Sequence, residues 1–175
     1  MRRDVPDNAL GFEARADRAD HATLKLWLRM LASTTQIEAE IRKRLRERFG
    51  ISLARFDYMA QLHRVEGGLR MKALSHCLMV TGGNVTGLTD ELERDGLVAR
   101  EGSPDDRRAW IVRLTPKGRK AFESMASEHE HWLLELFAGL DAKAVQQLYS
   151  HLGALRVHLA RNVARNVAMI EDTRA

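Results

Sequence analysis

Residues 82–98 read GGNVTGLTDELERDGLV, and the spacing of their apolar side chains decides the fold. Val85, Leu88 and Leu92 recur at intervals of three and four, which places them on one face of a helix. A threonine before this run can cap the helix, and an Asp-Gly pair ends it. The pattern predicts an amphipathic helix over about residues 82–94.

Directly after this helix the apolar spacing changes from the period of a helix to that of a strand. Residues 97–100 predict a short strand, and residues 101–108 are rich in turn-forming residues. Trp110, Val112 and Leu114 then alternate with their neighbours, which is strand spacing. Two short strands around this loop predict a β-hairpin.

The stretch upstream predicts two further short helices. Ser52 can cap a helix that runs to about residue 63. After a glycine-rich break, a shorter helix covers about residues 71–78. Three helices followed by a hairpin describe a winged helix-turn-helix, and residues 51–115 are predicted to form it.

A long helical region is predicted on each side of this lobe. The first covers residues 21–50 and ends at Gly50, and residues 116–175 form two more helices that Gly139 separates. Their apolar stripes exceed what one small domain can cover, so their simplest use is pairing with a second copy of the chain. The residues predicted at this dimer interface are Leu24, Trp132, Leu136, Leu148, Leu152, Leu155 and Leu159.

The predicted fold class is therefore mainly α with a small β-hairpin. It is a winged helix-turn-helix flanked by long N- and C-terminal dimerisation helices, with residues 1–20 as a flexible N-terminal arm.

Composition narrows the function classes. The chain has 175 residues, of which 45% are hydrophobic and 30% charged, and its formal net charge is +4. A basic balance favours acidic partners such as nucleic acid. No apolar run approaches the roughly 18 residues of a membrane span, and residues 1–20 lack an apolar signal core, so we expect a cytoplasmic protein.

The sequence offers no pattern for catalysis or for a metal. It has no phosphate-binding glycine motif and no nucleophile elbow. The spacing of its seven histidines matches no strong zinc site. We therefore expect no enzymatic activity, no cofactor and no metal. Cys77 stands alone, so it forms no intrachain disulfide, and we expect a buried, inert thiol rather than a redox sensor.

Three stretches together resemble the multiple-antibiotic-resistance regulator (MarR) family. Residues 83–98 resemble that family's recognition helix and first wing strand, residues 105–110 its wing tip, and residues 114–118 the exit into the next helix. The resemblance covers about residues 22–163. It implies a dimeric regulator that binds double-stranded DNA and responds to a small-molecule effector.

DNA contacts are expected from the 82–94 helix, the helix before it and the wing. A helix fits the major groove, small residues let its backbone approach DNA, and a wing arginine reaches the minor groove in the family. The candidate residues are Arg70, Lys72, Thr81, Gly82, Gly83, Asn84, Thr86, Gly87, Thr89, Asp106, Arg107 and Arg108. The alternative is that the charged residues are simply solvated. Asp90 is expected to pair with a nearby arginine, and Gly87 departs from the family, which often has a basic residue there.

A ligand site is expected where Ser33-Thr34-Thr35-Gln36 interrupts the apolar first helix, because a few polar groups in apolar surroundings suit a small molecule. The candidate residues are Trp27, Met30, Thr34, Arg55, Phe56 and Met59. The alternative is ordinary core packing with the hydroxyls bonded back to the preceding turn. The first two helices are similar to family members that control the breakdown of aromatic acids, which implies an aromatic acid or its coenzyme A thioester as effector.

These observations predict a dimeric regulator, a repressor that a ligand releases from a near-palindromic operator. The rival function is a winged-helix protein-interaction module without specific DNA binding. In that case Arg107, Arg108 and the 82–94 helix would bind an acidic protein surface, and salt dependence together with competition by plain duplex DNA would separate the two.

Overall fold

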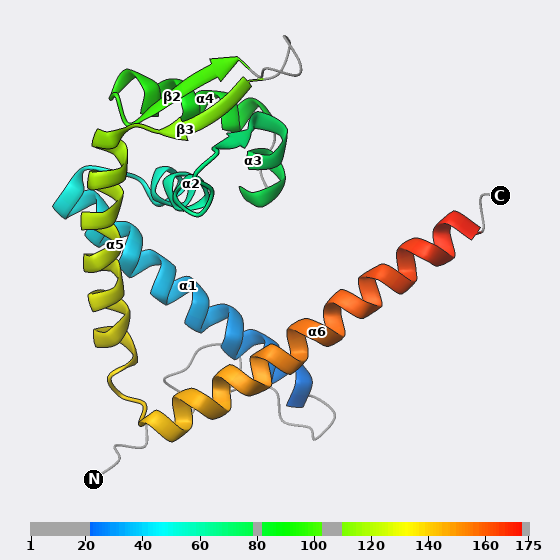
Figure 1. Cartoon of the computed structure of the whole chain (residues 1–175). Coiled ribbons are helices and arrows are strands. Elements are labelled where there is room, and N and C mark those ends of the chain that lie inside the picture. Colours follow the sequence, from blue (N-terminus) through cyan, green and yellow to red (C-terminus); the bar gives the residue numbers. More distant parts are fainter. Residues whose placement is uncertain (1–21, 79–81, 103–109, 173–175) are drawn as a thin grey trace. The chain divides into compact units, whose positions relative to one another are not determined.

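The computed structural model describes residues 22–78, 82–102 and 110–172 (Figure 1). It divides into two compact units, Met1–Trp132 and Leu133–Ala175. The elements are α1 (Ala22–Phe49), α2 (Leu53–His63), β1 (Leu69–Arg70), α3 (Met71–Leu78), α4 (Gly82–Arg94), β2 (Val98–Gly102), β3 (Trp110–Leu114), α5 (Pro116–Phe137) and α6 (Ala142–Asp172). The first unit therefore holds the lobe together with α1 and most of α5.

Local signals end and start the helices where the sequence predicted. Gly50 has a φ of +64° just past the end of α1, a conformation that glycine adopts without a steric penalty. The Ser52 hydroxyl accepts from the Arg55 N–H at 3.3 Å, and Thr115 accepts from the Gly118 N–H at 2.9 Å. Each hydroxyl satisfies a backbone donor that the first turn of a helix leaves without a partner.

The wing belongs to a three-stranded antiparallel sheet in the order β1-β3-β2. Arg100 lies opposite Val112 in the predicted hairpin, and Leu69 of β1 lies opposite Val112 on its other side. The prediction of two strands was incomplete, because a two-residue strand is too short to show a period. The predicted loop was also too long at its start, since β2 continues to Gly102.

One apolar core holds the lobe together. It draws its fully buried side chains from α2, α3, α4 and the sheet: Tyr58, Met59, Leu62, Leu74, Val85, Leu92, Val98 and Val112. Helix α5 lies close to the turn after α4 at Gly118, where an added Cβ would lie 1.8 Å from the Leu97 carbonyl oxygen. The start of α5 is therefore fixed directly on the turn that follows α4.

The helices predicted to form the dimer leave apolar surface uncovered in a single chain. Leu24 and Trp27 near the start of α1 are exposed, as are Leu148, Leu152 and Leu155 along α6. Trp132 differs from the other predicted interface residues. Its side chain is only 6% exposed and its ring lies 6.3 Å from that of Phe49, so it is packed inside its own chain, and its assignment to the dimer interface is corrected. None of the described helices is both long and apolar enough to cross a membrane.

Candidate nucleic-acid interface

Helix α4 exposes a row of small and polar residues along its first half. Gly82, Gly83, Asn84, Thr86 and Gly87 are all exposed. An added Cβ at any of the three glycines would meet no atom within 4 Å, so the backbone there is bare on its outer side. A ligand as large as a nucleic acid can approach this part of the helix closely.

Thr89 lies on the opposite side of α4 and is fully buried, with an exposed fraction of 0%. Its hydroxyl donates to the Val85 carbonyl at 2.6 Å and lies 2.6 Å from the Tyr58 hydroxyl. The prediction that Thr89 contacts DNA was wrong, because its polar group is satisfied inside the core.

The second half of α4 is tied to β2 by ion pairs. Arg100 pairs with Asp90, and its Nε lies 3.3 Å from a carboxylate oxygen of Glu93. The hydrogen bond to Asp90 raises the pKa of Arg100 above its ordinary value. The expectation that Asp90 pairs with an arginine is therefore confirmed.

The turn after α4 is held from two further elements. Arg55 of α2 forms an ion pair with Asp95. From the start of α5, Lys117 donates to the Asp95 carbonyl at 2.8 Å and Thr115 donates to the Gly96 carbonyl at 2.7 Å. Helix α4 is thus anchored at its buried side and at its end. The small and polar side chains of its first half face outward.

The remaining predicted DNA-contacting residues lie on β1 and α3 or outside the described residues. Arg70 at the end of β1 and Lys72 in α3 are exposed. Thr81 and the three predicted wing-tip residues (Asp106, Arg107 and Arg108) lie outside the described residues.

The exposed side chain of Trp110 was not predicted as a surface feature from the sequence. Trp110, the first residue of β3, is 52% exposed and lies opposite Gly102, which has no side chain to cover it. Its alternation with Val112 and Leu114 marked it only as a strand residue. Its exposure depends on strand register, which the apolar period alone did not reveal.

Cys77 is exposed near the end of α3, so the expected burial of its thiol was wrong. Helix α3 faces the core through Leu74, which is fully buried, and Leu78, which is half-buried. Cys77 is one position before Leu78 and therefore about 100° around the helix from it, which leaves its thiol outside this apolar face.

The six predicted ligand residues divide between exposed and buried positions. Phe56 and Met59 belong to the apolar core, and the Phe56 ring lies 5.4 Å from that of Phe122. Arg55 forms an ion pair with Asp95. All three side chains therefore have partners within the protein, and their assignment to a ligand is corrected.

The other three predicted ligand residues lie on α1. Trp27 is exposed, and Met30 is half-buried. The Thr34 hydroxyl donates to the carbonyl of Met30 at 2.9 Å. Thr34 is thus bonded to the preceding turn, as the alternative interpretation of this stretch expected.

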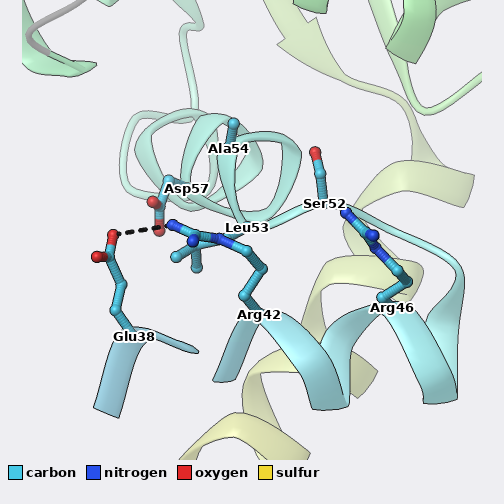
Figure 2. A pocket seen from close by; sticks show the side chains of 7 residues that line it. All are labelled: Glu38, Arg42, Arg46, Ser52, Leu53, Ala54 and Asp57. Atoms are coloured by element: carbon cyan, nitrogen blue, oxygen red, sulfur yellow. Dashed lines mark ion pairs between the residues drawn. The ribbon is translucent and has the colours of Figure 1, made fainter. Parts of the chain in front are cut away.

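A different cavity, of about 290 Å³, opens between α1 and the first turns of α2 (Figure 2). Its lining residues are Glu38, Arg42, Arg46, Ser52, Leu53, Ala54 and Asp57. Figure 2 shows both arginines extending from α1 toward α2, with Arg42 in an ion pair with Glu38 at 3.5 Å. Burial raises the pKa of Asp57 above its ordinary value; the charge of His129 opposes this, and the charge of Glu38 adds to it. The cavity therefore combines two cations, two carboxyl groups and two apolar side chains, Leu53 and Ala54.

No group of three or more histidine, cysteine, aspartate or glutamate side chains suited to a metal ion occurs among the described residues.

An exposed helix of small and polar residues, anchored behind a hairpin wing, defines the class of winged helix-turn-helix DNA-binding proteins.

Comparison with known proteins identifies the family within this class. The MarR family model matches residues 49–109. A solved MarR family regulator from Silicibacter pomeroyi is 32% identical, with a TM-score of 0.67 over 83% of this chain and 98% of that chain. The protein belongs to the MarR family of transcriptional regulators.

Two further similarities are informative. The transcriptional activatory protein BadR of Rhodopseudomonas palustris is 32% identical over 131 residues, 71% of this chain and 69% of that protein. The S. aureus MepR–DNA complex shares the fold, with 23% identity and a TM-score of 0.64 over 76% of this chain and 96% of that chain. The chain spans only 65% and 64% of the length of two other relatives, both from Bacillus subtilis. The names of all three relatives describe proteins that act on transcription.

Proposed function

We propose that this protein is a homodimeric regulator that binds a near-palindromic DNA operator and represses transcription until a small organic acid releases it. The exposed first half of α4, with bare backbone at Gly83 and Gly87 and an outward Asn84, is the observation that carries this proposal. We call α4 the recognition helix from here on.

The recognition helix has the groups that base reading requires. An asparagine amide can form two hydrogen bonds with the edge of an adenine in the major groove. Exposed glycines let the backbone approach the groove floor, and the free N–H groups of the first turn suit a phosphate. Arg70, Lys72 and the wing residues Arg107 and Arg108 would hold the DNA backbone and the minor groove.

Dimerisation accounts for the uncovered apolar side chains of α6 and the start of α1. Leu148, Leu152, Leu155 and Leu159 recur at intervals of four and three, so they form one stripe along α6, and all four are exposed in a single chain. A two-fold symmetric pair covers such stripes and places two recognition helices about 34–36 Å apart, one turn of DNA. The operator would therefore be near-palindromic.

An organic acid is the effector class that the cavity between α1 and α2 suits. Arg46 and Arg42 supply positive charge, and Leu53 and Ala54 supply apolar contact. We retain aromatic acids and their coenzyme A thioesters as the compounds to try first. Trp27, Met30 and Thr34 do not line this cavity and stay a separate candidate for ligand contact on α1. A ligand releases DNA only if it binds the released state more tightly than the DNA-bound state.

The test begins with selection of duplexes from a random-sequence pool by the purified protein, followed by a gel-shift titration of the enriched duplex. Enrichment of a near-palindromic sequence, bound in the presence of excess random DNA, is the expected result. Asn84→Ala should weaken binding and change the preferred sequence, whereas Val157→Ala, on exposed α6, should do neither. If no sequence is enriched, and an acidic protein competes as well as DNA does, the interaction-module function replaces this one.

The sign of regulation and the effector are tested on the enriched duplex. Placed across a promoter, it should lower reporter expression; an increase would make the protein an activator, as the name of BadR describes that relative. Benzoate and benzoyl-coenzyme A should lower the gel-shift affinity, and Arg46→Gln should remove that response while preserving DNA binding. If neither compound changes the affinity, the proposed effector class is wrong.

A further inference from the structure

Helix α2 contacts the recognition helix through two polar side chains that lie one turn apart. Arg55 pairs with Asp95 at the end of α4, and the Tyr58 hydroxyl lies 2.6 Å from the Thr89 hydroxyl in its middle. Residues three apart lie on the same side of a helix. Helix α2 thus presents one polar edge toward α4, in addition to the apolar contacts of the core.

The Tyr58–Thr89 contact is a directed chain of hydrogen bonds. The Val85 carbonyl can only accept, so Thr89 gives its single hydroxyl proton to Val85 at 2.6 Å. The Tyr58 hydroxyl must therefore donate to Thr89. Burial raises the pKa of Tyr58, which keeps the phenol protonated and able to donate.

Both side chains of this contact are fully buried, each with an exposed fraction of 0%. Water does not replace a partner that is lost at such a site. Removal of the Thr89 hydroxyl leaves the Tyr58 phenol without its acceptor, whereas removal of the Tyr58 hydroxyl leaves Thr89 bonded only to the helix that carries it. Removing the Tyr58 hydroxyl deletes one oxygen atom and preserves the ring that fills the core. Tyr58→Phe therefore isolates the hydrogen bond from the packing.

The far side of α4 carries the residues that would face DNA. An α-helix turns by about 100° per residue, so Gly87 and Asn84, two and five positions before Thr89, point away from Tyr58. A shift of α4 on its buried side therefore moves Asn84 by a similar amount. Base reading tolerates displacements of only about 0.5 Å, whereas long cationic side chains can follow a phosphate.

We propose that Tyr58 is a positioning residue for DNA reading, because its bond to Thr89 fixes how the recognition helix lies against α2 and hence where Asn84 meets the bases. This inference rests on the proposed DNA-binding function. Tyr58 would then affect how well the protein discriminates between DNA sequences, and not its affinity for DNA in general. The Arg55–Asp95 pair is a weaker second tie, since Asp95 is about half exposed.

Tyr58→Phe and Thr89→Val test the proposal on two probes, the duplex enriched by the wild-type protein and a random-sequence duplex of equal length. We expect each variant to lose about tenfold in affinity for the enriched duplex, with the random duplex and the salt dependence unchanged. Because Thr89→Val removes the bond to Tyr58 as well as the bond to Val85, the double variant should lose no more than Thr89→Val alone. Equal losses on both probes would overturn the proposal.

Two controls separate positioning from loss of stability. Tyr149→Phe removes the same atom from an exposed tyrosine in α6 and should leave both affinities unchanged. Ile41→Val opens a small cavity at a buried site in α1, outside the lobe. Each variant is measured at the same number of degrees below its own midpoint temperature of unfolding. If Ile41→Val then loses as much discrimination between the two duplexes as Tyr58→Phe does, Tyr58 has only a structural role.

Amide hydrogen exchange tests the tie without DNA. In Tyr58→Phe, amides of residues 82–94 should exchange faster relative to those of β2 and β3, because α4 has lost an anchor. Unchanged protection of α4 would overturn the proposal even if DNA affinity fell. If the wild-type protein enriches no sequence but residues 82–94 do exchange faster in Tyr58→Phe, the proposed function is wrong, whereas the role of the Tyr58–Thr89 bond in holding α4 against α2 is kept.

Discussion

Helices α4 and α6 carry apolar stripes of the same kind, yet one is covered and the other is not. In α4, Val85 and Leu92 are fully buried by α2, α3 and the sheet of the same chain. In α6, Leu148 and Leu155 repeat at helical spacing but remain exposed. The period of a sequence therefore identifies the apolar face of a helix, but not whether the covering partner lies in the same chain.

The largest effect should come from placing a charge on the uncovered stripe. Leu155→Asp should raise the dimer dissociation constant at least about a hundredfold, because each protomer loses a buried leucine worth about 1.5–3 kcal/mol and gains a charge. Sedimentation would then report a monomer whose lobe is still folded by circular dichroism. Val157→Asp lies about 180° from the stripe centre by helical spacing and should remain dimeric. A dimer that survives Leu155→Asp would show that another surface covers α6 or that the stripe is unused.

The second prediction concerns the covered region, where α5 meets the end of α4. Gly118→Ala should destabilise the protein by about 1–3 kcal/mol, because the new methyl group would meet the Leu97 carbonyl. Urea unfolding at fixed protein concentration measures this effect. Gly139→Ala is the matched control, since an added Cβ there meets nothing within 4 Å. Equal stability of the two variants would mean that α5 can move away from Leu97.

The third prediction is a substitution on the exposed face of α4 that should change stability and DNA affinity in opposite directions. Gly87→Ala should stabilise the protein by about 0.5–1 kcal/mol, because alanine is the better helix former and the site is open. The same methyl group should weaken DNA binding, since it stands on the face proposed to approach the groove. Thermal unfolding and gel-shift titration are the two measurements. A stabilised variant with unchanged DNA affinity would move the DNA-contacting face away from Gly87.

The smallest effect is a pH dependence from His129 of α5, whose ring lies 5.0 Å from that of Phe56 in the lobe. Burial lowers the pKa of His129, and the charge of Asp57 only partly offsets this. The folded state therefore binds this proton less readily than the unfolded state, so stability is lost as the pH falls below the ordinary histidine pKa of about 6.5. Urea unfolding at pH 7.5 and 5.5 should show a smaller loss in His129→Gln than in the wild type, while exposed His151→Gln should behave as the wild type does.

The features that the sequence predicted correctly are those that depend on neighbouring residues. The bounds of α3 and α4, the Ser52 and Thr115 caps and the glycine at the end of α1 all depend on residues within one turn of each other, so a single stretch of sequence contains them. Strand β1 was missed because two residues have no measurable period. Trp132 was placed on the dimer surface because apolar spacing cannot distinguish a neighbour in the same chain from one in a second copy.

The sequence by itself determined the order of the helices and of the two hairpin strands, the apolar face of each helix and the membership of a winged helix-turn-helix class, because caps, periods and turn residues are local properties of the chain. Only the tertiary structure decided which polar residues of α4 face outward. Thr89 is a threonine in a polar run like Thr86, but Tyr58, 31 positions earlier, draws its hydroxyl into the core. Arg55 and Asp95, 40 positions apart, are likewise joined only when α2 packs against α4. Such pairings depend on where folding brings distant residues together.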